Sequence, residues 1–113
     1  MTLSRWDVVF LRAEGRADPT GHPAVILSGE NTLGDAKQNR FNVLLGTKKP
    51  PAASTGAHQV LLNGADGLDH LTQLDCSLVY VARKESVLRS AGRVSPARRG
   101  EIARKVRAFL GLG

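Results

Sequence analysis

The sequence has a single cysteine, few aromatic residues and no long apolar run. Cys76 is alone among 113 residues, so an internal disulfide is excluded and no cysteine cluster is available for zinc. No run approaches the roughly 20 apolar residues that a membrane helix needs. The N-terminus also lacks the basic start and apolar core of a signal peptide. These absences predict a cytoplasmic protein that does not enter a membrane.

Other absences narrow the chemistry. Aromatic residues make up only 4% of the chain, so Trp6 is expected to pack in the core rather than stack on a nucleobase. His58 and His70 have no carboxylate or second histidine at ligand spacing, which argues against a metal site. The sequence contains neither a glycine-rich phosphate loop nor a nucleophile elbow. Asp66 and Asp69 are typical of turns.

Positive charge is concentrated in the last part of the chain. The net charge is +6, and residues 83–113 hold nine Lys or Arg and two Glu, whereas residues 1–82 carry a net −1. A basic segment on a nearly neutral body can attract nucleic acid or an acidic protein. It can equally be a solvated helix face that keeps a small protein soluble, and charge alone does not separate the two.

Short runs of Val, Ile and Leu bounded by Gly and Pro are typical of strands. We expect strands at residues 5–12, 23–28, 40–46, 58–63 and 73–82, and a sixth at 92–94. In the fifth, Leu74, Cys76, Leu78 and Tyr80 should alternate onto one face. Composition predicts loops at 13–22 and 48–57, a loop with at most one helical turn at 29–39, and a turn at 85–90.

The clearest element is a helix at about 96–110. Ser95 can cap it, Pro96 suits its first position, and Gly111 can end it. An apolar stripe is expected from Ile102, Val106, Phe109 and Leu110, with five basic residues pointing away from it: Arg98, Arg99, Arg104, Lys105 and Arg107. Five or six short strands and one helix predict a single mainly β domain over residues 1–113, a small bent sheet or barrel with the C-terminal helix packed against it.

Several segments, in order, carry a resemblance to a known family. They are Trp6-Asp7-Val8-Val9, Gly21-His22-Pro23-Ala24-Val25-Ile26-Leu27-Ser28, Asn42-Val43-Leu44-Leu45-Gly46-Thr47-Lys48, Gly67-Leu68 and Ala91-Gly92-Arg93-Val94-Ser95. With the closing helix, this arrangement resembles the MazF/PemK (Kid) family of bacterial toxins over nearly the whole chain. The resemblance implies an SH3-like small barrel (MazF/PemK/CcdB-like) that forms a homodimer. It also implies an endoribonuclease without metal or other cofactor, silenced by an acidic antitoxin protein.

The resemblance also implies where a site would lie. Members of the family cut single-stranded RNA and leave a 2′,3′-cyclic phosphate and a 5′-hydroxyl. The family's catalytic arginine corresponds to His22, and its Ser or Thr after the third strand corresponds to Thr47. Family members often carry an acidic residue followed by Gln in the fifth strand, where this chain has Ser77 and Leu78. One branch of the family also uses an arginine at the position of Asp75.

At most of these positions the chain departs from the family pattern, and the departures affect how RNA could be cleaved. Cleavage through the 2′-hydroxyl needs a base, an acid and positive charge or donors on the phosphate. Histidine cannot copy arginine's two-pronged grip, but it titrates near neutrality and can act as base or acid. We therefore predict His22 and Thr47 as catalytic, with substrate-binding residues Arg16, Arg40, Lys48, Lys49, Asp75 and Ser77. If strands 23–28 and 40–46 pair antiparallel, His22 and Thr47–Lys49 share one rim of the sheet.

Two alternatives stay open. In the first, His22 is merely a residue between loop and strand, and a catalytically weakened or inactive barrel binds RNA, an acidic peptide or an antitoxin. The second is a protein-targeting toxin similar to the gyrase-poisoning CcdB group. Those toxins use their last residues against gyrase, and the ending Phe109-Leu110-Gly111-Leu112-Gly113 does not match them obviously.

Overall fold

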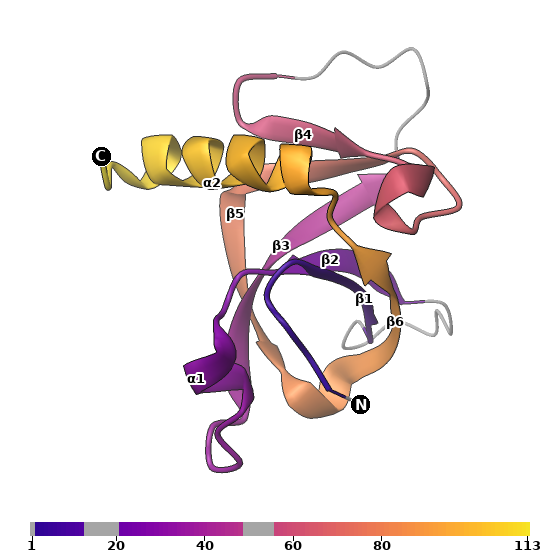
Figure 1. Cartoon of the computed structure of the whole chain (residues 1–113), viewed down its shortest axis with the longest axis vertical. Coiled ribbons are helices and arrows are strands. Elements are labelled where there is room, and N and C mark those ends of the chain that lie inside the picture. The colour runs from indigo at the N-terminus through magenta and orange to yellow at the C-terminus, as the bar shows by residue number, and fades with distance from the viewer. Residues whose placement is uncertain (1, 13–20, 49–55) are drawn as a thin grey trace.

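The computed structural model describes residues 2–12, 21–48 and 56–113. Its strands are β1 (Asp7–Leu11), β2 (His22–Ile26), β3 (Arg40–Lys48), β4 (Gln59–Leu62), β5 (Thr72–Arg83) and β6 (Val87–Arg93). They pair antiparallel in the order β4-β5-β3-β2-β1-β6. The helices are α1 (Glu30–Leu33) and α2 (Pro96–Leu110), with 3₁₀ turns η1 (Gly64–Asp66) and η2 (Lys84–Ser86). The sheet curls into a half-barrel, and α2 lies across one end beside β4 and β5 (Figure 1). The predicted mainly β fold with a C-terminal helix is therefore confirmed.

Strand β5 bends sharply where it crosses β3. Leu44 pairs with Val79 and Gly46 with Leu74, so residues 75–78 of β5 lie opposite Leu45 alone. Extra residues in one strand bend it and increase its twist. Figure 1 shows the result: β5 crosses the top of the molecule and then turns downward at the left. The prediction that Leu74, Cys76, Leu78 and Tyr80 share one face of the strand is therefore wrong. Leu74 and Cys76 are buried before the bend, whereas Leu78 and Tyr80 are 51% and 47% exposed after it.

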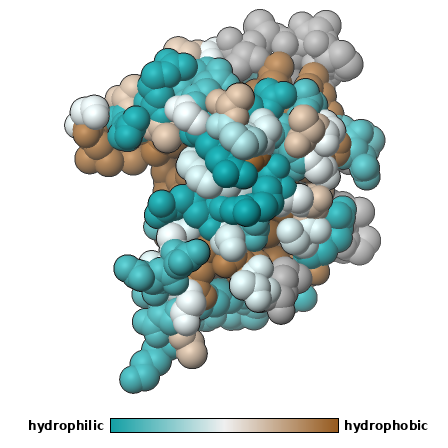
Figure 2. Space-filling view, in the orientation of Figure 1, coloured by the Kyte–Doolittle hydropathy of each residue, from teal (hydrophilic) through white to brown (hydrophobic). Residues whose placement is uncertain are grey.

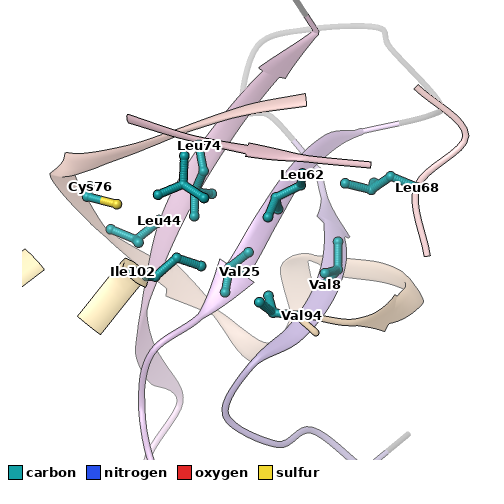
Figure 3. Close-up of a cluster of buried hydrophobic side chains, with 10 residues drawn as sticks. Val8, Val25, Leu44, Leu62, Leu68, Leu74, Cys76, Val94 and Ile102 are labelled. Atoms are coloured by element: carbon teal, nitrogen blue, oxygen red, sulfur yellow. The ribbon is translucent and has the colours of Figure 1, made fainter. Parts of the chain in front are cut away.

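The core consists of two clusters on opposite faces of the curled sheet. Successive strand residues point to opposite faces, so Val8 joins one cluster and Val9 the other. The first cluster fills the space between the sheet and α2, where Leu74, Cys76 and Ile102 meet (Figure 3). The second is formed by Val9, Leu11, Ala24, Ile26, Phe41, Val43 and Ala82. Trp6 packs on the first cluster, as expected of a core residue.

Helix α2 has the predicted bounds but sits differently from the prediction. Ile102 is buried and Val106 packs on the first cluster, whereas Phe109 and Leu110 are about half exposed. Three of the five basic side chains do not point into solvent but donate hydrogen bonds to backbone carbonyls. Arg98 donates to Leu61, Arg99 to Val94 and Lys105 to Gln59. Long basic side chains can lay their apolar stems along the surface to reach such carbonyls. Only Arg104 and Arg107 are exposed, as predicted for all five.

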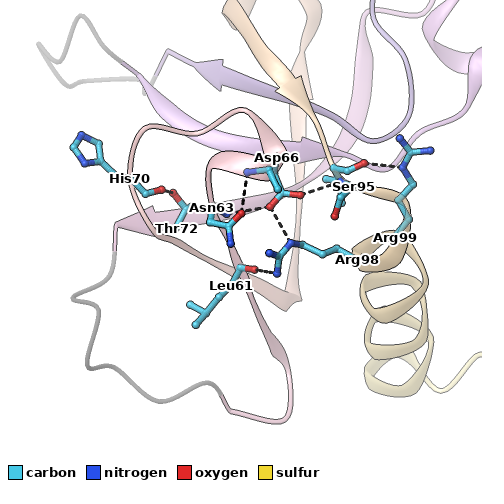
Figure 4. A network of polar contacts seen from close by, with 10 residues as sticks. Leu61, Asn63, Asp66, His70, Thr72, Ser95, Arg98 and Arg99 are labelled. Carbon is cyan, nitrogen blue, oxygen red and sulfur yellow. Dashed lines mark hydrogen bonds and ion pairs between the residues drawn. The ribbon is translucent and has the colours of Figure 1, made fainter.

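Asp66 ties η1 to the start of α2. Its carboxylate is fully buried and accepts hydrogen bonds from the backbone N–H groups of Asn63 (3.0 Å) and Ser95 (2.9 Å). Arg98 Nε lies 3.0 Å from Asp66 Oδ2, an ion pair that is not aligned as a hydrogen bond (Figure 4). The Ser95 hydroxyl makes no capping bond, so the expected cap is replaced by this network. Asp66 is a turn residue, as predicted, but also a buried link between two elements.

Several predicted boundaries shift for local reasons. The first strand begins at Asp7 because Trp6 adopts a left-handed conformation (φ 75°) in a turn closed by the Asp7 N–H and the Ser4 carbonyl. Strand β3 continues through Lys48, and β6 starts at Val87, where a turn was expected. Helix α1 is the single helical turn predicted within 29–39. Most of the predicted loops 13–22 and 48–57 lies outside the described residues.

Within the described residues, no helix is both long and apolar enough to cross a membrane.

Candidate active site

One row of residues runs across four neighbouring strands. Leu11 pairs with His22, and Thr47 pairs with Gln73. Ala24 pairs with Leu45, and continuing this antiparallel register by two residues sets His22 opposite Thr47. Residues directly opposite each other in antiparallel strands project to the same face and lie about 5 Å apart. The sheet thus brings His22 and Thr47 onto one rim, as inferred from the sequence, while their catalytic roles remain predictions.

The row opens into a cavity of about 580 Å³. All four residues of the row line it, together with Asp75 and the bent part of β5. The complete lining is Leu11, Arg12, His22, Leu45, Gly46, Thr47, Gln73, Asp75, Leu78, Tyr80, Val81, Ala82, Arg83 and Ser86. One wall is polar and carries an imidazole, a hydroxyl, an amide and a carboxylate. The lining also has an apolar part, because the bend of β5 turns Leu78, Tyr80 and Val81 out of the core.

A glycine is required where β2 enters the site. Gly21 has φ +75°, and a Cβ added to it would lie 2.6 Å from the carbonyl oxygen of Leu11 and 2.9 Å from Leu88 Cδ1. Only glycine adopts this conformation freely and allows so close an approach. The close contact between Gly21 and the end of β1 fixes His22 beside Leu11.

Asp75 lies in the residues of β5 that face Leu45. Its Oδ1 accepts hydrogen bonds from the backbone N–H and the hydroxyl of Ser77, at 3.0 and 2.6 Å. Ser77 is not part of the cavity lining. Of the two predicted β5 residues, Asp75 therefore reaches the cavity directly, and Ser77 orients its carboxylate.

Gln73 was not selected from the sequence. It is 7% exposed, and its Oε1 atom is buried without a hydrogen-bond partner among the described residues. Buried polar atoms nearly always have a partner, so an unpaired amide oxygen beside Thr47 calls for an explanation. A glutamine in a strand gives no local signal of such a position. Only the register of β5 with β3 identifies it.

The basic residues predicted to bind substrate lie at different distances from the cavity. Arg40 begins β3, seven residues before Thr47, and is not part of the cavity lining. Lys48 ends β3 directly after Thr47, and Arg16 and Lys49 lie outside the described residues. The arginines that do line the cavity are Arg12 and Arg83, which were not selected from the sequence: Arg12 directly follows β1, and Arg83 is the last residue of β5.

Cys76 and the isolated histidines contribute no site. Burial raises the pKa of the Cys76 thiol from 9.0 to about 11, opposed by nearby Lys105, so the thiol stays protonated near neutral pH. The His58 ring stacks edge-on against Phe109 with centroids 5.0 Å apart, and His70 is exposed. In the part of the chain that the structure describes, no group of three or more His, Cys, Asp or Glu is placed to hold a metal ion.

Apolar side chains are exposed on two neighbouring elements. They belong to the bent part of β5 and to the end of α2: Leu78, Val79, Tyr80, Val81, Phe109, Leu110 and Leu112. Both elements lie on the left side of Figure 1, and Figure 2 shows hydrophobic surface gathered around the C-terminal end of α2. We call these seven residues the apolar edge. Contiguous exposed apolar surface is typical of protein contact sites.

Comparison with known proteins gives a consistent result for the fold. No model of a known protein family matches the sequence, and no curated protein matches it. Solved structures do match, over nearly the whole chain. A mycobacterial endoribonuclease in complex with its cognate antitoxin superposes with a TM-score of 0.80 at 17% identity, covering 98% of this chain and 97% of that one. The chain has the MazF toxin fold.

Two further structures with the MazF fold agree. The Mycobacterium tuberculosis toxin MazF-mt6 matches with a TM-score of 0.75 at 13% identity, covering 93% of this chain and 96% of the toxin. The MazE–MazF complex of Deinococcus radiodurans matches with a TM-score of 0.75 at 17% identity, covering 98% of each chain. Identities this low establish the fold, so activity has to be argued from the residues at the site.

Proposed function

We propose that this protein is a toxin-type endoribonuclease that cleaves single-stranded RNA without a metal ion. The observation that carries the proposal is the row Leu11–His22–Thr47–Gln73, which sets an imidazole and a hydroxyl in one cavity. The half-barrel shared with MazF endoribonucleases supports it. RNA as the proposed substrate fits a cytoplasmic protein.

The chemistry proposed for the site balances with these groups. His22 takes the proton of the ribose 2′-hydroxyl, and the 2′-oxygen forms a bond to phosphorus as the bond from phosphorus to the 5′-oxygen breaks. Thr47 donates a hydrogen bond to a phosphoryl oxygen as negative charge develops there. Thr47 is exposed, so water reaches the site and protonates the departing 5′-oxygen. The hydroxide that remains takes the proton held by His22, which restores the neutral imidazole. The products are a 2′,3′-cyclic phosphate and a 5′-hydroxyl.

The test is cleavage of a long single-stranded RNA in the presence of EDTA. Wild type is expected to cut, and His22→Ala to lose at least a hundredfold in rate, since general acid–base groups contribute about 10²–10⁴. His70→Ala is the matched control because His70 is exposed and does not line the cavity. No cleavage by wild type, or equal rates for wild type and His22→Ala, would contradict this mechanism.

A binding module without catalysis is the second candidate. The observation that favours it is the residue itself: His22 stands where the resembled family has a catalytic arginine. RNA binding that weakens steeply with salt, together with intact RNA after long incubation, would select this function over the first.

We further propose two protein partners: a second copy of this chain and an acidic antitoxin. The apolar edge supports the homodimer, because half-exposed Phe109 and Leu110 at the end of α2 would be covered by a second copy. Similar structures contain antitoxin complexes, and the net charge of +6 favours an acidic partner. Sedimentation should give a dimer mass for wild type and a monomer mass for Leu110→Glu. Arg104→Glu, on the exposed basic face of α2, is the control expected to stay dimeric.

A further inference from the structure

Arg12 stands at the point where β1 ends beside the candidate active site. Leu11 is the last residue of β1 and pairs with His22, and Arg12 follows it. The Arg12 backbone N–H donates a hydrogen bond to the carbonyl of Ser86 at 2.8 Å, so its main chain is held against η2. The residue is exposed and lines the cavity. Its backbone position is therefore fixed next to His22, and its side chain is open to a ligand.

The other cavity arginine is placed differently. Arg83 lies at the end of β5 and pairs in register with Arg40, seven residues along β3 from Thr47. At about 3.4 Å per residue this corresponds to more than ~20 Å along the strand. Arg83 Nη1 also lies 3.8 Å from Glu85 Oε1, so its charge is partly balanced. Arg12 forms no ion pair with any of the residues that the structure describes. Of the two arginines that line the cavity, Arg12 is thus the one nearer to His22 along the sheet.

The proposed reaction needs a cation that His22 cannot supply. A histidine that accepts the 2′ proton must start neutral, so it cannot also hold the phosphate as a cation. A guanidinium stays charged and presents two parallel N–H donors that match two oxygens of one phosphate. Resting on the proposed function, we infer that Arg12 binds the scissile phosphate and stabilises the negative charge that develops on it. Arg12 thus supplies hydrogen bonds and positive charge to the phosphate, while His22 takes the 2′ proton.

Binding and cleavage can be measured separately. A single-stranded 2′-O-methyl oligonucleotide has no free 2′-hydroxyl and cannot be cut, so its affinity over a salt series reports phosphate contacts alone. Arg12→Ala is expected to lower the slope of log affinity against log salt by about 1. On cleavable RNA, the same variant should lose about 10²–10³ in kcat/KM, as for loss of one oxyanion donor. Arg12→Lys should keep most of the salt slope but lose tenfold or more in kcat, because lysine lacks the paired donors.

Arg83→Ala is the comparison variant, since it removes the other cavity arginine, and it should lose less kcat/KM than Arg12→Ala. Arg104→Ala, exposed on α2 and outside the cavity lining, is the control and should change kcat/KM less than threefold. All three variants should melt within ~2 °C of wild type because their side chains are exposed. The inference is overturned if Arg12→Ala keeps the wild-type slope and rate, or if Arg83→Ala causes the larger loss. If wild type binds the oligonucleotide but cuts no RNA, the ribonuclease proposal fails. A reduced slope for Arg12→Ala would in that case still establish the phosphate contact.

Discussion

Replacing Asp66 by Asn should uncouple the η1 turn from helix α2. The carboxylate is fully buried, with one oxygen accepting the Ser95 N–H and the other accepting the Asn63 N–H and facing the Arg98 guanidinium. Asparagine has almost the same shape but no charge. Its amide nitrogen would point a donor at another donor, whichever way the group is turned.

The magnitude follows from what is lost. A hydrogen bond to a charged group is worth about 1.5–3 kcal/mol, and removing one partner of a buried ion pair costs about 3–5 kcal/mol. The Arg98 side chain is 27% exposed, so water recovers part of its solvation after the change. We expect Asp66→Asn to lower the free energy of unfolding by about 3 kcal/mol. At roughly 4 °C per kcal/mol for a chain of this size, Tm should fall by about 12 °C.

Urea and thermal unfolding followed by circular dichroism measure this change. Asp69→Asn is the matched control, because Asp69 is exposed three residues later and should change stability by less than about 0.5 kcal/mol. A cycle with Arg98→Ala and the double variant should show a coupling of at least about 1 kcal/mol. Below its melting temperature Asp66→Asn should cut RNA like wild type, since Asp66 does not line the cavity.

The reasoning is refuted if Asp66→Asn loses less than about 1 kcal/mol, or if its effect and that of Arg98→Ala add without coupling. Either result would mean that the buried carboxylate is tolerated rather than stabilising. The backbone contacts of η1 alone would then hold the start of α2.

Three further predictions test other parts of the molecule. Gly21→Ala should lower the free energy of unfolding by about 2–3 kcal/mol and slow RNA cleavage, because its Cβ would lie 2.6 Å from the Leu11 carbonyl oxygen. Gly100→Ala, where a Cβ on α2 meets no other atom, should instead raise the free energy of unfolding by up to about 1 kcal/mol, as measured by urea titration. Gln73→Leu should keep or slightly raise Tm, since it removes an unpaired buried oxygen, while slowing RNA cleavage; a Tm loss above ~4 °C would show that the amide has a structural partner. Because the pKa of Cys76 is raised to about 11 in the folded protein, wild-type Tm should fall as pH rises from about 9 towards 11, where only the unfolded thiol ionises readily, and Cys76→Ala should lack that part of the pH dependence.

The sequence predicts the parts of this fold that depend on local patterns. Strands β1 to β5 follow from short apolar runs bounded by Gly and Pro, and α2 follows from Pro96, the spacing of Ile102 and Val106, and Gly111. The closeness of His22 and Thr47 also follows, because strands that are consecutive in the chain usually lie side by side in a sheet. These inferences need only neighbouring residues or neighbouring strands.

Features that depend on distant residues could not be predicted. The bend of β5 arises where residues 75–78 face Leu45, and the regular alternation of Leu74 to Tyr80 conceals it. The bend exposes Leu78 and Tyr80 and brings Asp75 rather than Ser77 into the cavity. Gln73 adjoins the site because β5 pairs with β3 across 26 residues of chain.

The position of His22 explains why the fold alone does not decide activity. His22 is the first residue of β2, half-buried at the rim, and the core of that strand begins only with the buried residues after it. A substitution at such a strand end leaves the packing of Val25 and Ile26 intact, so the half-barrel persists with or without an arginine there. Function then depends on whether a neighbouring element supplies the missing positive charge. Because β1 ends directly beside His22, Arg12 lines the same cavity, and we propose that it supplies this charge without any change of fold.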